Sequence, residues 1–322
     1  MTSLYPAIYA VLISFALSVI LCYVLIPFLR RLKLGQNVRD DGPQSHLKKA
    51  GTPSMGGIMI VISFAVACCF FHKDVRTLGV ILFVALAFAL LGFWDDYIKV
   101  VKKRSLGLRA YQKMLGQIII AGVTVALLYL NNDAFFGGTI TQIVVPFTDK
   151  VWDMGWLYAP FTFIVIIGTV NSSNLTDGLD SGVTVLMTTF FLFIALAANQ
   201  SLTPYAGALI GSLLGFLLFN SHPARVMMGD TGSLALGGII AIIAVLLRMP
   251  LFILIVGFAY VAECLSVILQ VGFFKLTKKR IFKMAPIHHS FELSGWSETR
   301  VVALFYIVTA MLCLIGYLGY KA

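Results

Sequence analysis

The chain has 322 residues, of which 59% are hydrophobic and 12% charged, so it is too apolar for a soluble domain, where about 45–50% is usual. Its apolar runs repeatedly reach the ~20 residues that cross a bilayer as a helix. They are continuous rather than alternating, which argues against a membrane β-barrel. The formal net charge of +10 comes mostly from basic residues in alternate loops, so it requires no nucleic-acid partner.

The predicted fold is all-α: a polytopic membrane protein with ten transmembrane helices. We expect one domain over residues 1–322, because no repeat, low-complexity tract or flexible linker divides the chain. Basic residues follow the first apolar run rather than precede it, unlike in a cleaved signal peptide. In chain order, the expected spans are 7–29, 55–72, 78–98, 111–130, 157–173, 182–198, 203–219, 233–248, 250–273 and 301–319.

The basic residues predict the orientation of these spans. Nineteen of the 24 lysines and arginines fall in the odd-numbered loops between spans. Loops rich in lysine and arginine stay in the cytoplasm. The odd loops are therefore expected to be cytoplasmic, and both termini periplasmic or extracellular.

Carboxylates gather at the cytoplasmic edge of three separate spans. Asp95 and Asp96 lie in "WDDYIK", Asp177 and Asp180 in "NSSNLTDGLDSG", and Asp230 in "MMGDTGS". Carboxylates that share one face either repel each other or share a cation, and hard oxygen ligands of this kind suit Mg²⁺.

Glycine-rich segments lead into spans that enter the membrane from the cytoplasm. They are "GTPSMGG" (51–57), "DGLDSG" (177–182) and "GDTGS" (229–233). A helix N-terminus offers free N–H groups and a positive dipole end to an anion. Carboxylates for a metal and N–H groups for phosphates on one face together suggest chemistry on a diphosphate.

Each motif also has a simpler interpretation. Asp177, Asp180 and Asp230 could be ordinary helix caps, and Ser233 a better one. Asp95 could pair with Lys99 at i+4 on a solvated helix end. For any one loop alone capping is favoured, whereas the three acidic loops together favour a functional site.

Other polar residues are candidates of a weaker kind. His288 and His289 are adjacent in "KMAPIHHSFELSGWSETR" (283–300), a spacing that suits zinc poorly; the segment is either a surface loop or a site that hydrogen-bonds a substrate phosphate or base. Asn220 ends a span and either caps it or contacts a ligand. Glu263 lies on one face of the ninth span with Gln270, where an acid is either functional or part of an interhelix hydrogen bond.

Five segments carry a resemblance that covers nearly the whole chain. In order they are "KKAGTPSMGG", "GFWDDYIKV", "NLTDGLD", "HPARVMMGDTGSLALGG" and "APIHHSFE". They resemble the phospho-N-acetylmuramoyl-pentapeptide transferase (translocase I) family, a branch of the polyprenyl-phosphate N-acetylhexosamine-1-phosphate transferases. The resemblance implies a ten-span, homodimeric enzyme of the bacterial inner membrane with a cytoplasmic active site. It also implies the reaction: phospho-MurNAc-pentapeptide moves from its UDP carrier to undecaprenyl phosphate, giving UMP and lipid I for peptidoglycan synthesis, with Mg²⁺ as cofactor.

The resemblance assigns roles to individual residues. It implies that Asp95, Asp96 and Asp230 are essential carboxylates, with Asp230 as the metal ligand. The other site residues that it implies are Lys99, Lys113, His288 and His289 as active-site groups and Lys49, Asn174, Asp177, Asp180, Asn220 and Met227 as substrate-binding groups.

Three positions depart from the family pattern. Ser290 stands where a third histidine is usual, Met227 where a phenylalanine stacks on uracil, and Ser181-Gly182 where a Gly-Leu pair follows. These departures bear on substrate and inhibitor contacts and leave the carboxylates untouched.

The mechanism stays open at two points. The lipid phosphate attacks the β-phosphorus of the UDP-sugar, and Mg²⁺ and the lysines stabilise the diphosphate and the leaving UMP. Either Asp95 or Asp96 deprotonates the lipid phosphate or steers the metal, or else a covalent aspartyl-phosphate forms. A cationic environment of metal and lysines is expected to offset the repulsion between Asp95 and Asp96.

Two other functions compete with this one. The first is a related transferase that uses UDP-GlcNAc. The second is a transporter of a phosphorylated substrate, which is disfavoured because transporters place charges near the midplane and often have repeated halves.

Overall fold

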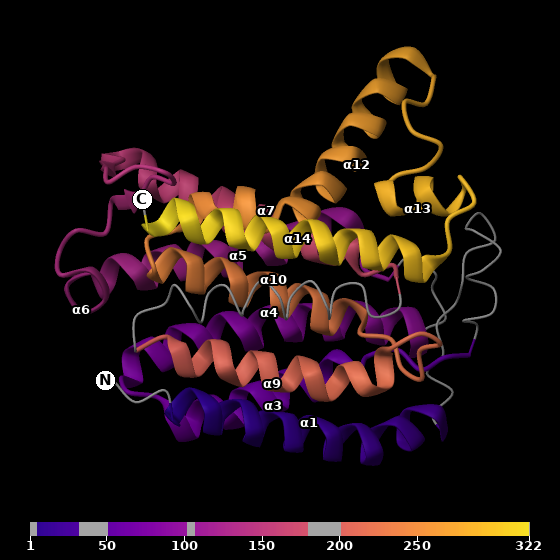
Figure 1. Cartoon of the computed structure of the whole chain (residues 1–322), viewed down its shortest axis with the longest axis horizontal. Helices are drawn as coiled ribbons and strands as arrows, with labels where there is room; N and C mark the ends of the chain where they lie inside the picture. Colours follow the sequence, from indigo (N-terminus) through magenta and orange to yellow (C-terminus); the bar gives the residue numbers. More distant parts are fainter. Residues whose placement is uncertain (1–4, 32–50, 102–106, 180–200, 322) are drawn as a thin grey trace.

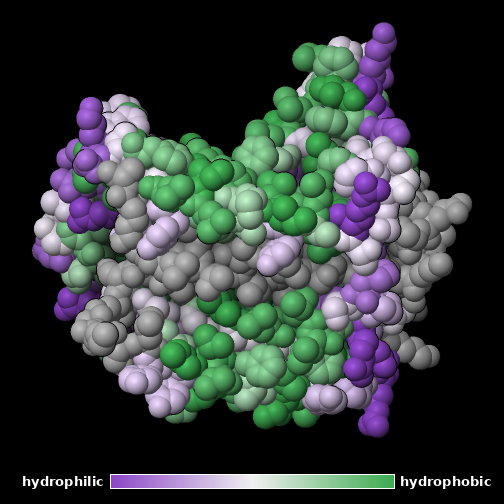
Figure 2. All heavy atoms as spheres, in the orientation of Figure 1, coloured by the Kyte–Doolittle hydropathy of each residue, from purple (hydrophilic) through white to green (hydrophobic). Residues whose placement is uncertain are grey.

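In the computed structural model, long helices lie side by side as a bundle (Figure 1). The structure describes residues 5–31, 51–101, 107–179 and 201–321. Within them, eight helices are long and apolar enough to cross a membrane. Figure 2 shows hydrophilic side chains at both ends of the bundle and a hydrophobic band between them, as expected for a protein that spans a bilayer.

The long helices run in both directions along the bundle, and a short β hairpin lies between α6 and η1. Figure 1 shows both termini at one end of the bundle and α13 at the other. The elements are α1 (Tyr5–Arg31), α3 (Gly57–Phe71), α4 (Val75–Val101), α5 (Ala110–Leu130), α6 (Asn132–Phe136), β1 (Gln142–Val144), β2 (Val151–Asp153), η1 (Gly155–Leu157), α7 (Tyr158–Thr176), α9 (Thr203–Asn220), α10 (Gly229–Leu246), η2 (Pro250–Phe252), α11 (Ile253–Val256), α12 (Phe258–Thr277), α13 (Ile287–Glu292) and α14 (Glu298–Lys321).

Nine of the ten expected spans fall on these helices, and the expected span 182–198 lies outside the described residues. α3 has 15 residues, fewer than the ~20 of a straight span. The expectation of one continuous helix over 250–273 is wrong. The chain forms η2 and α11, leaves helical geometry at Gly257 (φ −92°, ψ 19°), and then begins α12. Glycine favours such a break because it has the most backbone freedom to lose in a helix. Beyond the break α12 projects away from the bundle (Figure 1).

α10 lies at the centre of the fold. Its residues from Thr231 to Val245 are all buried, and it packs against α4, α7 and α3. Gly237 lies against the backbone of α7 at Val170, and Gly238 lies against Phe88 of α4. Small residues let helices approach closely in a membrane, where van der Waals packing drives association. The position of α10 is therefore set by neighbours on several sides.

α1 and α9 form a second closely packed pair. Gly207, Gly211 and Gly215 recur every fourth residue on α9 and lie against the backbone of α1. The Ser18 hydroxyl of α1 donates a hydrogen bond of 2.8 Å to the backbone oxygen of Ser212. Packing and an interhelix hydrogen bond thus stabilise the same interface.

Arg248 joins the elements at the end of the bundle that holds both termini. It follows α10, and its guanidinium donates hydrogen bonds to Gln142 Oε1 (2.9 Å), the Phe136 backbone oxygen (2.7 Å) and Thr139 Oγ1 (2.6 Å). It also lies over the Phe136 ring, 5.6 Å from the ring centroid. One side chain therefore ties α6 and β1 to the end of α10.

We expect Arg248→Ala to lower the free energy of unfolding by roughly 2–3 kcal/mol, because three hydrogen bonds of about 1 kcal/mol each are lost. The measurement is the apparent Tm of the purified protein in detergent. Lys73→Ala, at an exposed lysine, is the matched control and should leave the Tm unchanged. Equal Tm values for the two variants would show that Arg248 does not hold this end together.

Candidate active site

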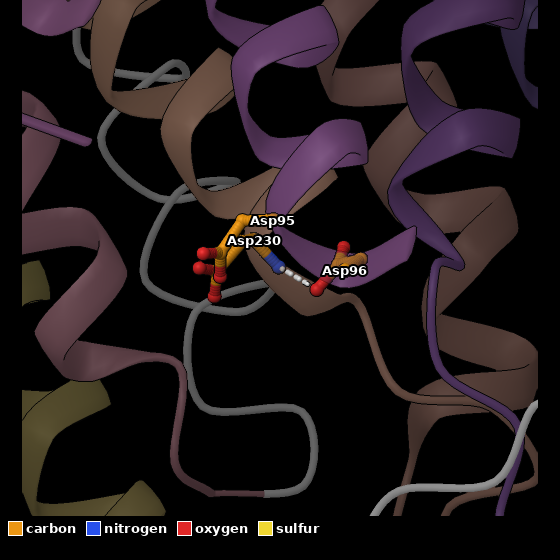
Figure 3. Close-up of side chains that lie close together, drawn as sticks. All are labelled: Asp95, Asp96 and Asp230. Atoms are coloured by element: carbon orange, nitrogen blue, oxygen red, sulfur yellow. Dashed lines mark hydrogen bonds between the residues drawn. The ribbon is translucent and has the colours of Figure 1, made fainter. Parts of the chain in front are cut away.

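Three carboxylates meet where the end of α4 crosses the start of α10. Gly92 allows the crossing, because a Cβ there would lie 2.1 Å from the Asp230 backbone oxygen. One oxygen from each of Asp95, Asp96 and Asp230 lies within 4.8 Å of the others (Figure 3). Asp95 and Asp96 are 2% and 3% exposed, so water does little to screen their charges. The prediction that acidic loops far apart in sequence share one face is confirmed for these three residues.

The Asp96 carboxylate binds the N-terminus of α10. It accepts hydrogen bonds from the backbone N–H groups of Asp230 (3.1 Å) and Thr231 (2.9 Å) and from the Thr231 hydroxyl (2.7 Å). Figure 3 shows the first of these bonds, with Asp96 turned away from the other two carboxylates. A carboxylate at this position satisfies free donors and the positive end of the helix dipole. Asp96 therefore caps α10 from another helix.

Asp95 and Asp230 share a lysine. Lys99 Nζ lies 2.5 Å from Asp95 Oδ2 and 3.0 Å from Asp230 Oδ2. The i+4 pairing of Asp95 with Lys99 predicted from the sequence is thus present, and the lysine also bridges to α10. Asp95 Oδ1 accepts a further hydrogen bond of 2.7 Å from the backbone N–H of Leu108.

α5 and α7 complete the cluster around Asp230. Lys113 Nζ lies 2.7 Å from Asp230 Oδ2 and 2.7 Å from Asn174 Oδ1. Asn174 Nδ2 donates to Asp230 Oδ1 (3.0 Å) and to Ser233 Oγ (2.9 Å). Asp230 is therefore held by side chains from α4, α5 and α7.

The donor set of this cluster fits a divalent cation. Three carboxylates face two ammonium groups, Lys99 and Lys113, which leaves an excess of negative charge. The oxygens are hard ligands of the kind that Mg²⁺ takes. The side chains of Lys99, Lys113 and Asp230 are 34%, 18% and 14% exposed, so the cluster opens to solvent on the side of the lysines.

Two supporting contacts were not predicted from the sequence. Gln117 and Asn171 exchange amide hydrogen bonds of 3.2 and 2.7 Å between α5 and α7. They lie one turn from Lys113 and Asn174, so helical spacing was the available signal. Thr231, which binds Asp96, follows Asp230 directly in the sequence and gave no separate signal.

The expectation of free helix N–H groups for phosphates is wrong at the first turns of α3 and α10. Gly56 N–H donates to the Met227 oxygen (2.9 Å) and Gly57 N–H to the Met228 oxygen (2.8 Å), while Asp96 takes the N–H groups of Asp230 and Thr231. The physical reason is that the two glycine-rich loops pair with each other, since Met227 N–H also donates to the Pro53 oxygen.

The remaining candidates lie in other contacts. Asn220 is buried and donates to the Val226 oxygen (3.0 Å) in the loop before α10 rather than to the end of its own helix, and Met227 is buried at 5% exposure. Asp177 ends α7, and His289 Nδ1 lies 2.9 Å from Glu292 Oε2. Lys49 and Asp180 lie outside the described residues.

Glu263 does not pair with Gln270. It lies 3.1 Å from His288 Nδ1, whereas Gln270 Oε1 accepts from the backbone N–H groups of Ile281 (3.1 Å) and Phe282 (2.9 Å). The residues on this face of α12 thus bind the segment that follows the helix.

Comparison with known proteins gives consistent matches. The model of glycosyl transferase family 4 matches residues 78–248, and phospho-N-acetylmuramoyl-pentapeptide-transferase signature 1 matches residues 49–61. Three similar proteins carry the name phospho-N-acetylmuramoyl-pentapeptide-transferase. They come from Acetivibrio thermocellus (49% identity, 98% of this chain, 96% of the relative), Clostridium kluyveri (47%, 98% and 100%) and Bacillus subtilis (48%, 96% and 96%).

We expect Gly92→Ala to destabilise the protein by about 1–3 kcal/mol, because the new methyl group must push α4 away from the Asp230 backbone. Gly79→Ala lies on the same helix with open space around its Cβ. It should be neutral or slightly stabilising, since alanine favours a helix by up to about 1 kcal/mol over glycine. Apparent Tm values in detergent compare the two. A Gly92→Ala protein as stable as Gly79→Ala would mean that the crossing is looser than the structure shows.

Proposed function

The chain belongs to the phospho-N-acetylmuramoyl-pentapeptide transferases of glycosyl transferase family 4, and from this premise we propose the reaction in detail. The protein transfers phospho-MurNAc-pentapeptide from UDP-MurNAc-pentapeptide to undecaprenyl phosphate, and releases UMP and lipid I. The observation that carries the proposal is the cluster of Asp95, Asp96 and Asp230 with Lys99 and Lys113 at one end of a membrane-spanning bundle. The protein is a multi-pass protein of the bacterial cell membrane.

The lysines neutralise phosphate charge in the transfer step. An oxygen of the lipid phosphate forms a bond to the β-phosphorus of the UDP-sugar, and the bond from that phosphorus to the UMP oxygen breaks. Catalysis of such a step depends mainly on positioning and charge stabilisation. Lys99 and Lys113 offer ammonium groups at the exposed side of the cluster, where they bind the diphosphate and the leaving UMP.

Asp95 is the proposed proton acceptor for the lipid phosphate. Its Oδ2 faces Lys99 beside Asp230, on the side of the cluster that carries the lysines, whereas Asp96 binds the N-terminus of α10. The proton of the lipid phosphate moves to Asp95 as the new P–O bond forms. Asp96 instead fixes the backbone of Asp230.

Asp230, with Asp95 beside it, is the proposed ligand of Mg²⁺. The three carboxylates and their excess of negative charge support this assignment. When bound, the ion neutralises charge on the diphosphate. Asn174 Nδ2 donates a hydrogen bond to Asp230 Oδ1 and so keeps the Asp230 side chain in place.

The nucleotide side of the site rests on the family resemblance. It assigns six residues to the substrate, namely Lys49, Asn174, Asp177, Asp180, Asn220 and Met227, and makes His288 and His289 active-site groups. Asn174 contacts the carboxylate cluster directly, and Met227 links the loop before α10 to the loop before α3. These contacts support a UDP-sugar site between α7 and the two loops.

An apolar groove supports a lipid acceptor. A cavity of about 350 Å³ lies between α7, α10, α11 and α12, and almost all of its lining is apolar. Ile164, Leu254 and Leu265 line it and are more than half or nearly half exposed, so it opens to the lipid side. Ser172 also lines it, two residues before Asn174. The groove thus lies on the helix that also carries Asn174, which supports a polyprenyl chain bound beside α7.

We further propose the arrangement in the membrane. The chain is one transferase domain with its active site on the cytoplasmic face and both termini outside, as the basic loops favour. Family resemblance favours a homodimer. Labelling of single cysteines in intact cells tests the first, and light scattering in detergent tests the second.

The purified protein should release UMP only when UDP-MurNAc-pentapeptide, undecaprenyl phosphate and Mg²⁺ are all present. Asp230→Asn should lower kcat by about 100-fold or more, because a charged group at the reacting phosphates is lost. Asp133→Asn, an exposed residue of α6, is the control and should keep full activity.

The same assay separates the competing functions. Release of UMP from UDP-GlcNAc but not from UDP-MurNAc-pentapeptide would move the protein to the related transferases. Nucleotide binding without any turnover would reopen the transporter function.

Gly168→Leu tests the lipid groove. Gly168 lines the cavity and has open space around its Cβ. A leucine there should raise the KM for undecaprenyl phosphate by about tenfold, because it fills part of an apolar site, and should leave the KM for the UDP-sugar unchanged. Gly122→Leu on α5, also with open space, is the control. Equal KM values in both variants would exclude this groove as the lipid site.

A further inference from the structure

Glu263 and His288 form a buried pair that the proposed chemistry does not use. Glu263 lies on α12 and is 0% exposed, and His288 lies on α13 and is 1% exposed. Glu263 Oε2 and His288 Nδ1 are 3.1 Å apart. The pair joins a membrane-spanning helix to the short helix that follows it.

Each member of the pair depends on the other. Within the described residues, neither side chain has a well-aligned hydrogen bond, although all four of their polar atoms are buried. A buried polar group without a partner costs free energy, and a buried carboxylate costs more. The short distance between Nδ1 and Oε2 makes each group the available partner for the other.

The other side of the His288 ring lies against the turn that ends α7. A Cβ on Gly178 would lie 2.6 Å from His288 Nε2, so the ring is in contact with the backbone of this turn. Gly178 follows Asp177, which ends the helix that carries Asn174. The imidazole is therefore enclosed between α12 and the end of α7.

His289 depends on the same arrangement. Its ring lies next to that of His288, with 4.0 Å between the ring centroids. Ser290 fixes the start of this segment, since its hydroxyl donates to the Met284 oxygen (2.6 Å) and accepts from the Met284 N–H (3.1 Å). A shift of His288 would thus move His289 and the Asp177 turn together.

We infer that Glu263 is a positioning residue, which holds His288 against Gly178 and thereby places Asp177 and His289 for the UDP-sugar. This inference rests on the proposed function, because it concerns the nucleotide side of the same site. The resemblance makes His288 an active-site group, but its ring is only 1% exposed, so it acts through its neighbours rather than by touching substrate. Glu263 affects binding of the UDP-sugar and leaves the lipid groove unchanged.

Glu263→Leu removes both carboxylate oxygens and leaves His288 without a partner. We expect the Kd for UDP-MurNAc-pentapeptide to rise by about tenfold or more, since breaking a buried pair leaves one member uncompensated. The KM for undecaprenyl phosphate should stay within about twofold, because the groove is not altered. Glu263→Gln keeps an acceptor oxygen for Nδ1 and should recover part of the affinity.

The double variant Glu263→Leu with His288→Phe tests whether the two residues act as a pair. If they do, the Kd of the double variant for the UDP-sugar should be no higher than that of the single variant that binds it less tightly. The reason is that replacing both polar partners removes the unpaired group. Additive losses would overturn the inference, as would a Glu263→Leu protein with the affinity of the wild type. Ser266→Ala is the matched control, since Ser266 is buried on the same helix and its hydroxyl donates to the Glu263 backbone oxygen.

Hydrogen exchange separates this inference from the proposed function. Exchange at residues 287–292 and 174–179 should speed up in Glu263→Leu and return towards the wild-type rate in the double variant, whatever reaction the protein performs. A wild-type protein that binds no UDP-sugar would contradict the proposed function alone, and the exchange rates would still decide the pairing. Unchanged exchange in Glu263→Leu would overturn the pairing itself.

Discussion

The crossing of α4 and α10 is the constraint on which the site depends. Gly92 brings the two backbones into contact, and Asp96 then accepts the first N–H groups of α10. The carboxylate thereby fixes the helix that carries Asp230, and the other faces of that helix are buried against α3 and α7. A side chain that holds a metal or a phosphate must have a fixed backbone beneath it. Here Asp96 of α4 caps α10 and thereby fixes the backbone beneath Asp230.

Adjacent carboxylates persist at this membrane edge because they have different partners. The sequence suggested that lysines and a metal would offset the repulsion between Asp95 and Asp96 together. The structure differs for Asp96, which interacts with the helix dipole and N–H groups of α10. Asp95 instead faces Lys99 and the backbone N–H of Leu108. Consecutive residues on a helix point about 100° apart, so one Asp-Asp pair can serve both a structural and a chemical purpose.

The sequence predicted the parts of this protein that depend on local patterns. Apolar length located eight spans that coincide with single helices and a ninth, 250–273, that the structure breaks at Gly257. The position of acids at span ends predicted that Asp95, Asp96 and Asp230 lie together, as they do in the structure. The sequence could not predict the contacts that depend on where the chain runs after a helix is broken or ends. The break at Gly257 redirects α12. The chain then reverses after Lys278 (φ 59°) and brings His288 back against Glu263, a contact between residues 25 positions apart that no periodicity encodes. The expectation of free N–H groups at the starts of α3 and α10 was wrong for a similar reason. These groups are bound because two loops far apart in the sequence pair with each other, and such tertiary contacts cannot be read from local patterns.

The last two turns of α7 connect the separate parts of the site. Gly168 and Ser172 line the apolar groove, whereas Asn171 and Asn174 face α5 and the Asp230 cluster. The turn that follows, at Asp177 and Gly178, covers His288. One helix thus presents the groove on one side and the charged cluster on the other, and it ends at the proposed nucleotide site. Because a helix is rigid over two turns, α7 fixes the position of the proposed lipid groove relative to the charged cluster, and such positioning is what the proposed transfer requires. The packing of α7 between α5, α10 and α12 therefore contributes to the proposed reaction together with the charged residues.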